Sequence, residues 1–243
     1  TRNLTKKRVT AKGNEIAVIE STDYSTHWLG WLHHSKLIHF THRGSDITAG
    51  AQSPGLIFPT TAIFSYSSAS LTGGLAESTL VGNEGIVGLW LLSPKTISTV
   101  STSLQTPGFG IVVDADFLHR EIFHSSEFRQ TLLNHANASV WYATQTCFCY
   151  RHHTIEQQVS KTILLTLLRT GRDEVQMSHQ MIAGVLGIRR EAVSTALKHL
   201  QKLNLIEQKR CSIVVRQPTA LASEACECYP LIRAQLGYSP LAA

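Results

Sequence analysis

A run of polar side chains near the C-terminus has the residue types and spacing that contact with DNA requires. Apolar residues recur among them every three to four positions, from Val193 to Leu203, which predicts an amphipathic helix with one polar face. The groups on that face can pair with phosphates and base edges, and a major groove admits one helix of this width. The pattern therefore predicts a helix that reads DNA. Its polar face carries Arg189, Arg190, Glu191, Ser194, Thr195, Lys198 and His199.

A second helix is predicted directly before this one. Ser178 is a favourable N-cap, and an apolar face follows from Ile182 to Leu186. Gly187 interrupts the pattern where a sharp turn is needed. After the second helix, residues 205–215 read as a short β-hairpin in the position of a wing. The segment is thus predicted to be a winged helix-turn-helix.

The distribution of charge supports this prediction. The chain has 243 residues and a net charge of +5. Residues 151–243 hold 12 Lys/Arg against 7 Asp/Glu, whereas residues 1–150 hold 10 of each. The whole positive excess therefore lies in the part that contains the predicted DNA-reading helix, as a polyanion-binding module needs. Two amphipathic helices joined through glycine could also form an ordinary helical hairpin, and a solvated basic face could have the same composition.

The front of the chain has a different character. Residues 15–118 contain short apolar runs separated by glycine and proline, which predicts a β-sandwich or barrel. Gly73-Gly74 is a predicted hairpin turn. The basic start, residues 1–14, is predicted to be a flexible leader and not a secretory signal, because no apolar region follows it. The expected strands are Glu15–Glu20, Leu56–Pro59, Ala62–Tyr66, Ser78–Val81, Ile86–Leu92, Thr96–Ser101 and Phe109–Val113.

A long helix is predicted next, from about Glu127 to Tyr150. An apolar stripe of near-helical period runs along it, so it must either cover the sheet domain or pair with its copy in a second chain. Both can hold for different turns. A further amphipathic helix, from about Thr154 to Thr170, ends at Gly171. The residues expected at a dimer contact are Leu132, Leu133, Ala136, Val140, Thr144 and Cys147.

The order of β-rich domain, long helix and winged helix-turn-helix resembles the family of the cyclic-AMP receptor protein and the fumarate–nitrate regulator (Crp–Fnr). The resemblance covers about residues 38–230. It rests on local sequences as well as on the order. These are GLIFPTTAIFSY, VGNEGIVGLW, CYRHHTIEQQVSKTILL, LGIRREAVSTALKHLQKLNLIE and SEACECY. The last three are similar to a branch of the family without an assigned effector.

The resemblance implies an α+β fold: a cyclic-nucleotide-binding-like jelly roll, a long dimerisation helix and a C-terminal winged helix-turn-helix. It implies a homodimer on a palindromic site, with Arg190 at a guanine edge and Glu191 at cytosine N4. Arg189 is an added phosphate or base contact. Thr195 replaces a base-reading arginine of the cyclic-AMP receptor, so the operator should differ. The wing has Cys211 where glycine is common. The expected base-reading residues are Arg189, Arg190, Glu191, Ser194 and Thr195; the expected phosphate contacts are Ser178, His179, Gln180, Lys198, Lys209 and Arg210.

Cyclic-AMP dependence is not expected. Glu84 and Gly85 match the ribose-binding pair of the family and are the candidate effector residues. However, no arginine occurs between Arg43 and Arg120 to pair with a cyclic phosphate. The glycines of the VGNEGIVGLW loop read as turn glycines, not as a phosphate loop.

The cysteines give little sign of a cofactor, and none is expected. No cysteine precedes Cys147, which excludes an N-terminal iron–sulfur centre; the five cysteines fit a reducing cytoplasm better than a disulfide framework. Cys149 and His153, at i and i+4, have metal-ligand spacing, and Cys226-Glu227-Cys228 could ligate a soft metal. We interpret both groups as structural, so that no metal site is expected.

The sequence thus predicts a cytoplasmic transcription regulator and not an enzyme, since no catalytic motif is present. Its expected partners are double-stranded DNA and a second copy of the chain, with RNA polymerase and an unidentified small-molecule effector as further candidates and no membrane. The alternatives are a ligand-, metal- or redox-responsive sensor whose basic domain binds DNA non-specifically or binds a protein, and an architectural DNA protein. The expected boundaries are 1–14 leader, 15–126 sensor-like domain, 127–152 long helix and 153–243 DNA-binding domain.

Overall fold

The structure, a computed structural model, describes residues 5–11, 14–20, 34–41, 55–69, 75–92 and 100–238. The chain divides into two units, Thr1–Lys36 and Leu37–Ala243. In the first unit, β1 (Thr5–Ala11) pairs antiparallel with β2 (Asn14–Glu20). The predicted strand at Glu15–Glu20 is confirmed. The prediction of a flexible leader over residues 1–14 is wrong for Thr5–Ala11, where β-branched residues favour a strand.

Two antiparallel sheets of three strands form the β-rich part. One has the order β3 (Ser35–Phe40), β8 (Gly108–Asp114), β4 (Gly55–Pro59). The other has the order β6 (Leu75–Val81), β5 (Ile63–Ala69), β7 (Ser101–Thr106). Their buried side chains form one cluster that includes Ile57, Phe64, Val81, Leu104 and Val112. Small antiparallel sheets packed in this way agree with the predicted jelly-roll-like domain.

One predicted strand is wrong. The segment Ile86–Leu92 makes a single β-bridge, between Val87 and Ile57, and then turns into a 3₁₀ helix, η2 (Leu89–Leu92). Gly88 has φ of +100°, a conformation that ends the extended run. The expected Gly73-Gly74 turn lies outside the described residues, as does most of the expected strand Thr96–Ser101.

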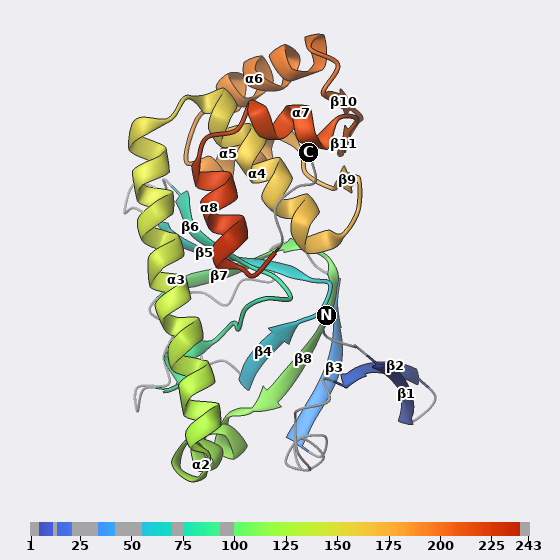
Figure 1. Cartoon of the computed structure of the whole chain (residues 1–243), viewed down its shortest axis with the longest axis vertical. Coiled ribbons are helices and arrows are strands. Elements are labelled where there is room, and N and C mark those ends of the chain that lie inside the picture. The colour runs from blue at the N-terminus through green and yellow to red at the C-terminus, as the bar shows by residue number, and fades with distance from the viewer. Residues whose placement is uncertain are drawn as a thin grey trace. The chain divides into compact units, whose positions relative to one another are not determined.

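Two helices follow β8 (Figure 1). The first, α2 (Ala115–His124), was not predicted; Asp114 caps it by accepting bonds from the amides of Asp116 and Phe117. The second, α3 (Ser126–His152), confirms the predicted long helix and extends it by a few residues. In Figure 1, α3 runs from α2 to the C-terminal helices.

The C-terminal part contains the predicted helix-turn-helix and wing. Thr154 and Gln157 form a capping box before α4 (Ile155–Thr170), and Gly171 ends it with φ of +63°. Ser178 caps α5 (His179–Leu186), whose turn at Gly187 leads to α6 (Arg190–Lys202). These elements confirm the sequence prediction. The wing comprises β10 (Ile206–Gln208) and β11 (Ile213–Val215), which pairs with β9 (Glu174–Val175); α7 (Pro218–Ser223) and α8 (Cys228–Gln235), both unforeseen, complete the domain.

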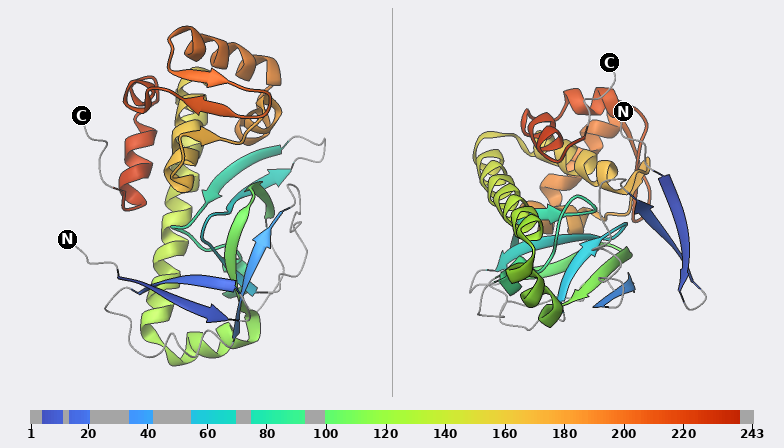
Figure 2. Two further views of the ribbon diagram at one scale, coloured as in Figure 1. Left: turned by 90° about the vertical axis from the view of Figure 1, so that its right-hand side faces the viewer. Right: turned by 60° about the horizontal axis from the view of Figure 1, so that its bottom comes forward.

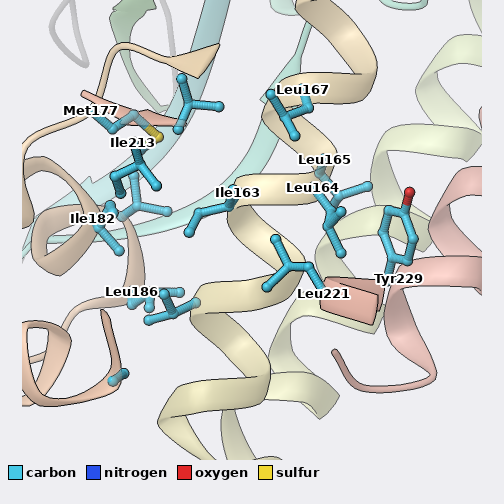
Figure 3. Close-up of a cluster of buried hydrophobic side chains, with 14 of the residues drawn as sticks. Ile163, Leu164, Leu165, Leu167, Met177, Ile182, Leu186, Ile213, Leu221 and Tyr229 are labelled. Carbon is cyan, nitrogen blue, oxygen red and sulfur yellow. The ribbon is translucent and has the colours of Figure 1, made fainter. Parts of the chain in front are cut away.

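A single hydrophobic cluster joins these C-terminal elements (Figure 3). Ile163 of α4 lies at its centre, fully buried, with Ile182 and Leu186 of α5 on one side and Leu221 and Tyr229 on the other. Because α4 contributes buried residues on nearly every turn, it is the internal axis of the domain. None of the described helices is long and apolar enough to cross a membrane.

Candidate nucleic-acid interface

The polar face of α6 is open to solvent. Arg189, Arg190, Glu191, Thr195 and Lys198 are all exposed, whereas the opposite face of the helix is fully buried. The buried face consists of Val193, Ala196, Leu197 and Leu200. The apolar residues of the helix therefore pack against the core of the domain, and its polar side chains are available to a partner.

Ser194 differs from its neighbours on this face. It is half-buried, and its hydroxyl donates to the carbonyl of Arg190 at 3.0 Å and bonds Nδ1 of His179 at 2.8 Å. The other ring nitrogen of His179, Nε2, lies 2.9 Å from Oε1 of Gln208 in the wing. His179 thus ties together α5, α6 and β10, and a contact of His179 or Ser194 with DNA would compete with these bonds.

The two helices of the motif begin differently. The hydroxyl of Ser178 accepts from the amide of Met181 at 3.2 Å, so the start of α5 is capped. The start of α6, at Arg189, has no side-chain cap. The same end of the helix carries its first amides and the exposed Arg189 and Arg190. This end is therefore suitable for an anion. Gln180, on the first turn of α5, is also exposed.

The wing is a tight hairpin beside α6 (Figure 2). The amide of Lys209 donates to the carbonyl of Ser212 at 2.9 Å, which leaves Arg210 and Cys211 at the exposed tip. Among the described residues other than glycine, only Asn204 has positive φ, so Cys211 needs no glycine-like conformation in this turn. Nζ of Lys209 lies 3.6 Å from Oε2 of Glu174, an exposed pair that solvent weakens.

The expected dimer residues of α3 separate into two faces. Leu132 is 2% exposed and packs into its own chain, and Ala136 is half-buried. Leu133 and Val140, in contrast, are 63% and 67% exposed. Thr144 and Cys147 continue this exposed face, which we call the α3 stripe: Leu133, Asn137, Val140, Thr144 and Cys147, at spacings of three or four residues.

Glu84 forms a buried ion pair that the sequence did not reveal. Its Oε1 lies 2.7 Å from Nε of Arg169 in α4, and the side chains are 10% and 0% exposed. Arg169 also donates to the carbonyls of Leu80 and Leu165, at 3.3 and 3.1 Å. A Cβ on Gly82 would come within 2.9 Å of the Arg169 side chain, which explains the glycine there. A ligand that used Glu84 would have to displace Arg169; effector binding at Glu84 and Gly85 stays a prediction.

A second acid is buried nearby. Glu77 is 7% exposed, and burial raises the pKa of its carboxyl to about 8, although Arg169 and Lys161 lower it. Its Oε2 has no hydrogen-bond partner. The carbonyl of Glu77 accepts from the hydroxyl of Tyr150, which also donates to the carbonyl of Val185 in α5. Tyr150 therefore links β6 to the helix-turn-helix through two main-chain carbonyls.

The two cysteine groups come together, although the sequence interpretation kept them separate. Cys149 and His153, at the end of α3, lie against Cys226 and Cys228, at the start of α8. A hydrogen bond with Cys226 and the ammonium of Lys161 lower the pKa of the Cys149 thiol. The other two cysteines, Cys147 and Cys211, are exposed.

Comparison with known proteins identifies the C-terminal domain. Residues 158–224 match the family described as the Crp-like helix-turn-helix domain. This span includes α5, the whole of α6 and the wing. The match confirms the resemblance for the C-terminal part of the chain.

Solved structures share the fold over most of the chain. A transcriptional regulator of the crp/fnr family from Eubacterium rectale has a TM-score of 0.66 at 15% identity, covering 84% of this chain and 95% of that one. FixK2 from Bradyrhizobium japonicum has a TM-score of 0.64 at 14% identity, covering 79% and 98%. A CRP-family transcriptional regulator from Thermus thermophilus has a TM-score of 0.63 at 15% identity, covering 78% and 96%. No curated protein matches the chain.

Proposed function

We propose that this chain, a transcription regulator with a Crp-like helix-turn-helix domain on the fold of the Crp–Fnr regulators, binds palindromic DNA as a homodimer and reads its sequence. The observation that carries the proposal is the exposed polar face of α6, backed by a fully buried apolar face. Arg190 and Glu191 supply a bidentate donor and an acceptor suited to guanine and cytosine edges. Lys198, Lys209 and Arg210 are the proposed phosphate-contacting cations, and Arg189 contacts a base or a phosphate.

The α3 stripe is the proposed dimer contact. Leu133 and Val140 are exposed apolar side chains about two turns apart, on the face that a second helix would cover. Asn137 lies between them, and a single asparagine in an apolar helix seam fixes the register of the pair at some cost in stability. A two-fold axis along α3 would give two recognition helices, which reach successive major grooves when half-sites lie about 34–36 Å apart. RNA polymerase is a further proposed partner.

We do not assign the protein a cyclic nucleotide. Glu84 is paired with Arg169 of the same chain. The hydroxyl of Tyr66 bridges the loop after Glu84, because it donates to the Ile86 carbonyl and accepts from the Gly88 amide. The same proposal includes an effector other than a cyclic nucleotide, and action in the cytoplasm. No catalytic role is proposed.

The test uses fragments of the source genome. Fragments retained by the purified protein are bound again in a mobility-shift assay with excess random-sequence duplex as competitor. Discrete complexes that survive the competitor support the proposal, and Arg190→Ala should lose them while Arg120→Ala, an exposed arginine on α2, keeps them. Binding that the competitor removes uniformly would contradict it and favour a non-specific or protein-binding basic domain.

A further inference from the structure

Four side chains that can ligate a metal ion meet where α3 ends and α8 begins. They come from two segments far apart in the sequence: Cys149 and Cys226 are separated by 77 residues. The ligand atoms of Cys149, His153, Cys226 and Cys228 all lie within 4.8 Å of one another. The three cysteines are 0–2% exposed, and the His153 side chain is 9% exposed.

The separations suit a tetrahedral ion. Sγ of Cys149 lies 3.6 Å from Sγ of Cys226, and Sγ of Cys228 lies 3.6 Å from Nδ1 of His153. With zinc–sulfur and zinc–nitrogen bonds of about 2.3 and 2.0–2.1 Å, the edges of a tetrahedron are roughly 3.5–3.8 Å. Two of the six ligand separations thus match the edges of such a tetrahedron, and the other four are 4.8 Å or less.

The surrounding groups orient the ligands. Oε1 of Glu227 lies 3.0 Å from Nε2 of His153, so that Nδ1 is the nitrogen that faces the sulfurs. A carboxylate on the outer nitrogen of a metal-bound histidine fixes its tautomer and orientation. Nε2 of Gln145 donates to Sγ of Cys228 at 3.1 Å, which orients that sulfur in the same way.

Charge is also balanced at this place. Three thiolates and one divalent ion leave a net charge of −1, which is unfavourable in a buried site unless a cation is near. Nζ of Lys161 lies 3.2 Å from Sγ of Cys149 and supplies that cation from α4. A disulfide between Cys149 and Cys226 would not explain why Cys228, His153 and Glu227 lie at the same place.

We propose that Cys149, His153, Cys226 and Cys228 bind one zinc ion in a closed, tetrahedral Cys₃His site. Four protein ligands leave no open position, so the ion is structural and not catalytic. Our sequence interpretation gave these residues a structural role without a metal; the proposal keeps the structural role and adds the ion. The site fastens the end of α3 to α8, which also packs against α4, and so holds the segment through which the long helix enters the C-terminal domain.

The first test is the metal content of the full chain, purified under reducing conditions, loaded with zinc chloride and desalted. One zinc per chain is expected in the wild type and in Cys147→Ser, whose thiol is exposed and outside the cluster. Cys228→Ser should retain far less. A wild type that retains no zinc, or equal zinc in Cys228→Ser, would overturn the proposal. DNA binding does not enter this measurement, so its result is independent of the proposed function.

A second test avoids any substitution in the buried cluster. Co²⁺ replaces zinc as the probe, and the titration follows the thiolate-to-cobalt charge-transfer band and the ligand-field bands of tetrahedral cobalt. Glu227 is 61% exposed, so Glu227→Gln should fold normally and bind Co²⁺ about 10–100-fold more weakly. Glu224→Gln, three residues earlier, should bind as the wild type does. Octahedral spectra without a charge-transfer band, unchanged affinity in Glu227→Gln, or a Cys149–Cys226 disulfide formed in preference to metal binding would overturn the site.

Discussion

Arg190 is the side chain on which the proposed base recognition most depends. It is exposed at the first turn of α6, and a bidentate arginine–guanine pair is a strong discriminator. Arg190→Ala should weaken binding to the operator by about 1–3 kcal/mol per contact and relax the base preference at one position of each half-site. Titration of operators with each base at that position measures both effects. Unchanged preference and affinity would mean that α6 is placed differently on DNA.

The ion pair of Glu84 with Arg169 should be a sensitive point of stability. Removal of one partner leaves the other charge buried without compensation, which destabilises a protein by about 3–5 kcal/mol. Glu84→Ala should therefore lower the free energy of unfolding in urea by an amount in this range. Glu84→Gln combined with Arg169→Met removes both charges and should recover part of the loss. A loss below about 1 kcal/mol in Glu84→Ala would show that water reaches the pair.

Glu77 should make stability depend on pH. Its pKa rises from 4.5 to about 8 on folding, so between these values the folded chain keeps a proton that the unfolded chain has released. This contribution to stability is present below pH 4.5 and is lost as the pH rises through 8, at up to about 1.4 kcal/mol per pH unit. Glu77→Gln, which is neutral at every pH, should show a flatter dependence in urea unfolding across this range. Equal slopes would mean that Glu77 is ionised in the folded chain.

At the scale of elements, the α3 stripe makes a prediction about assembly. A charge at the centre of a helix contact is left buried and unpaired, so Val140→Glu should convert the proposed dimer to a monomer. Sedimentation equilibrium measures this directly. Thr131→Glu is the control, since Thr131 is exposed and lies about two and a half turns away, on the other side of α3. Dimers of equal stability in both variants would place the contact elsewhere.

The elements that sequence predicts well are those with local signals. The helices α4, α5 and α6 could be predicted because caps and apolar periodicity mark them: Thr154 and Gly171 bound α4, and Ser178 and Gly187 bound α5. By contrast, α2 begins within the predicted β-rich region, although Asp114 caps it. The segment Ile86–Leu92 has the apolar composition of a buried strand but not its conformation, because Gly88 adopts positive φ.

At the scale of the whole chain, the main surprises are contacts between distant residues. Glu84 and Arg169 are 85 positions apart, and Cys149 and Cys226 are 77 apart. No arginine lies near Glu84 in the sequence. In the folded chain, however, Arg169 of α4 pairs with Glu84. No local pattern can reveal such pairs, because they depend on how β6, α3, α4 and α8 pack together. The exposed polar face of α6, in contrast, is contained in one helix and could be predicted.

The most direct test of the account is selection of bound sequences from a random duplex pool at near-physiological salt. A dimer that reads bases through α6 should enrich a two-fold-symmetric motif, with half-sites about one helical turn apart and a guanine position that Arg190→Ala no longer selects. Salt is kept near physiological because phosphate contacts alone, which are blind to sequence, give tight binding only at low salt. Recovery of bound duplexes without any shared motif would contradict the claim that this chain is a sequence-reading regulator.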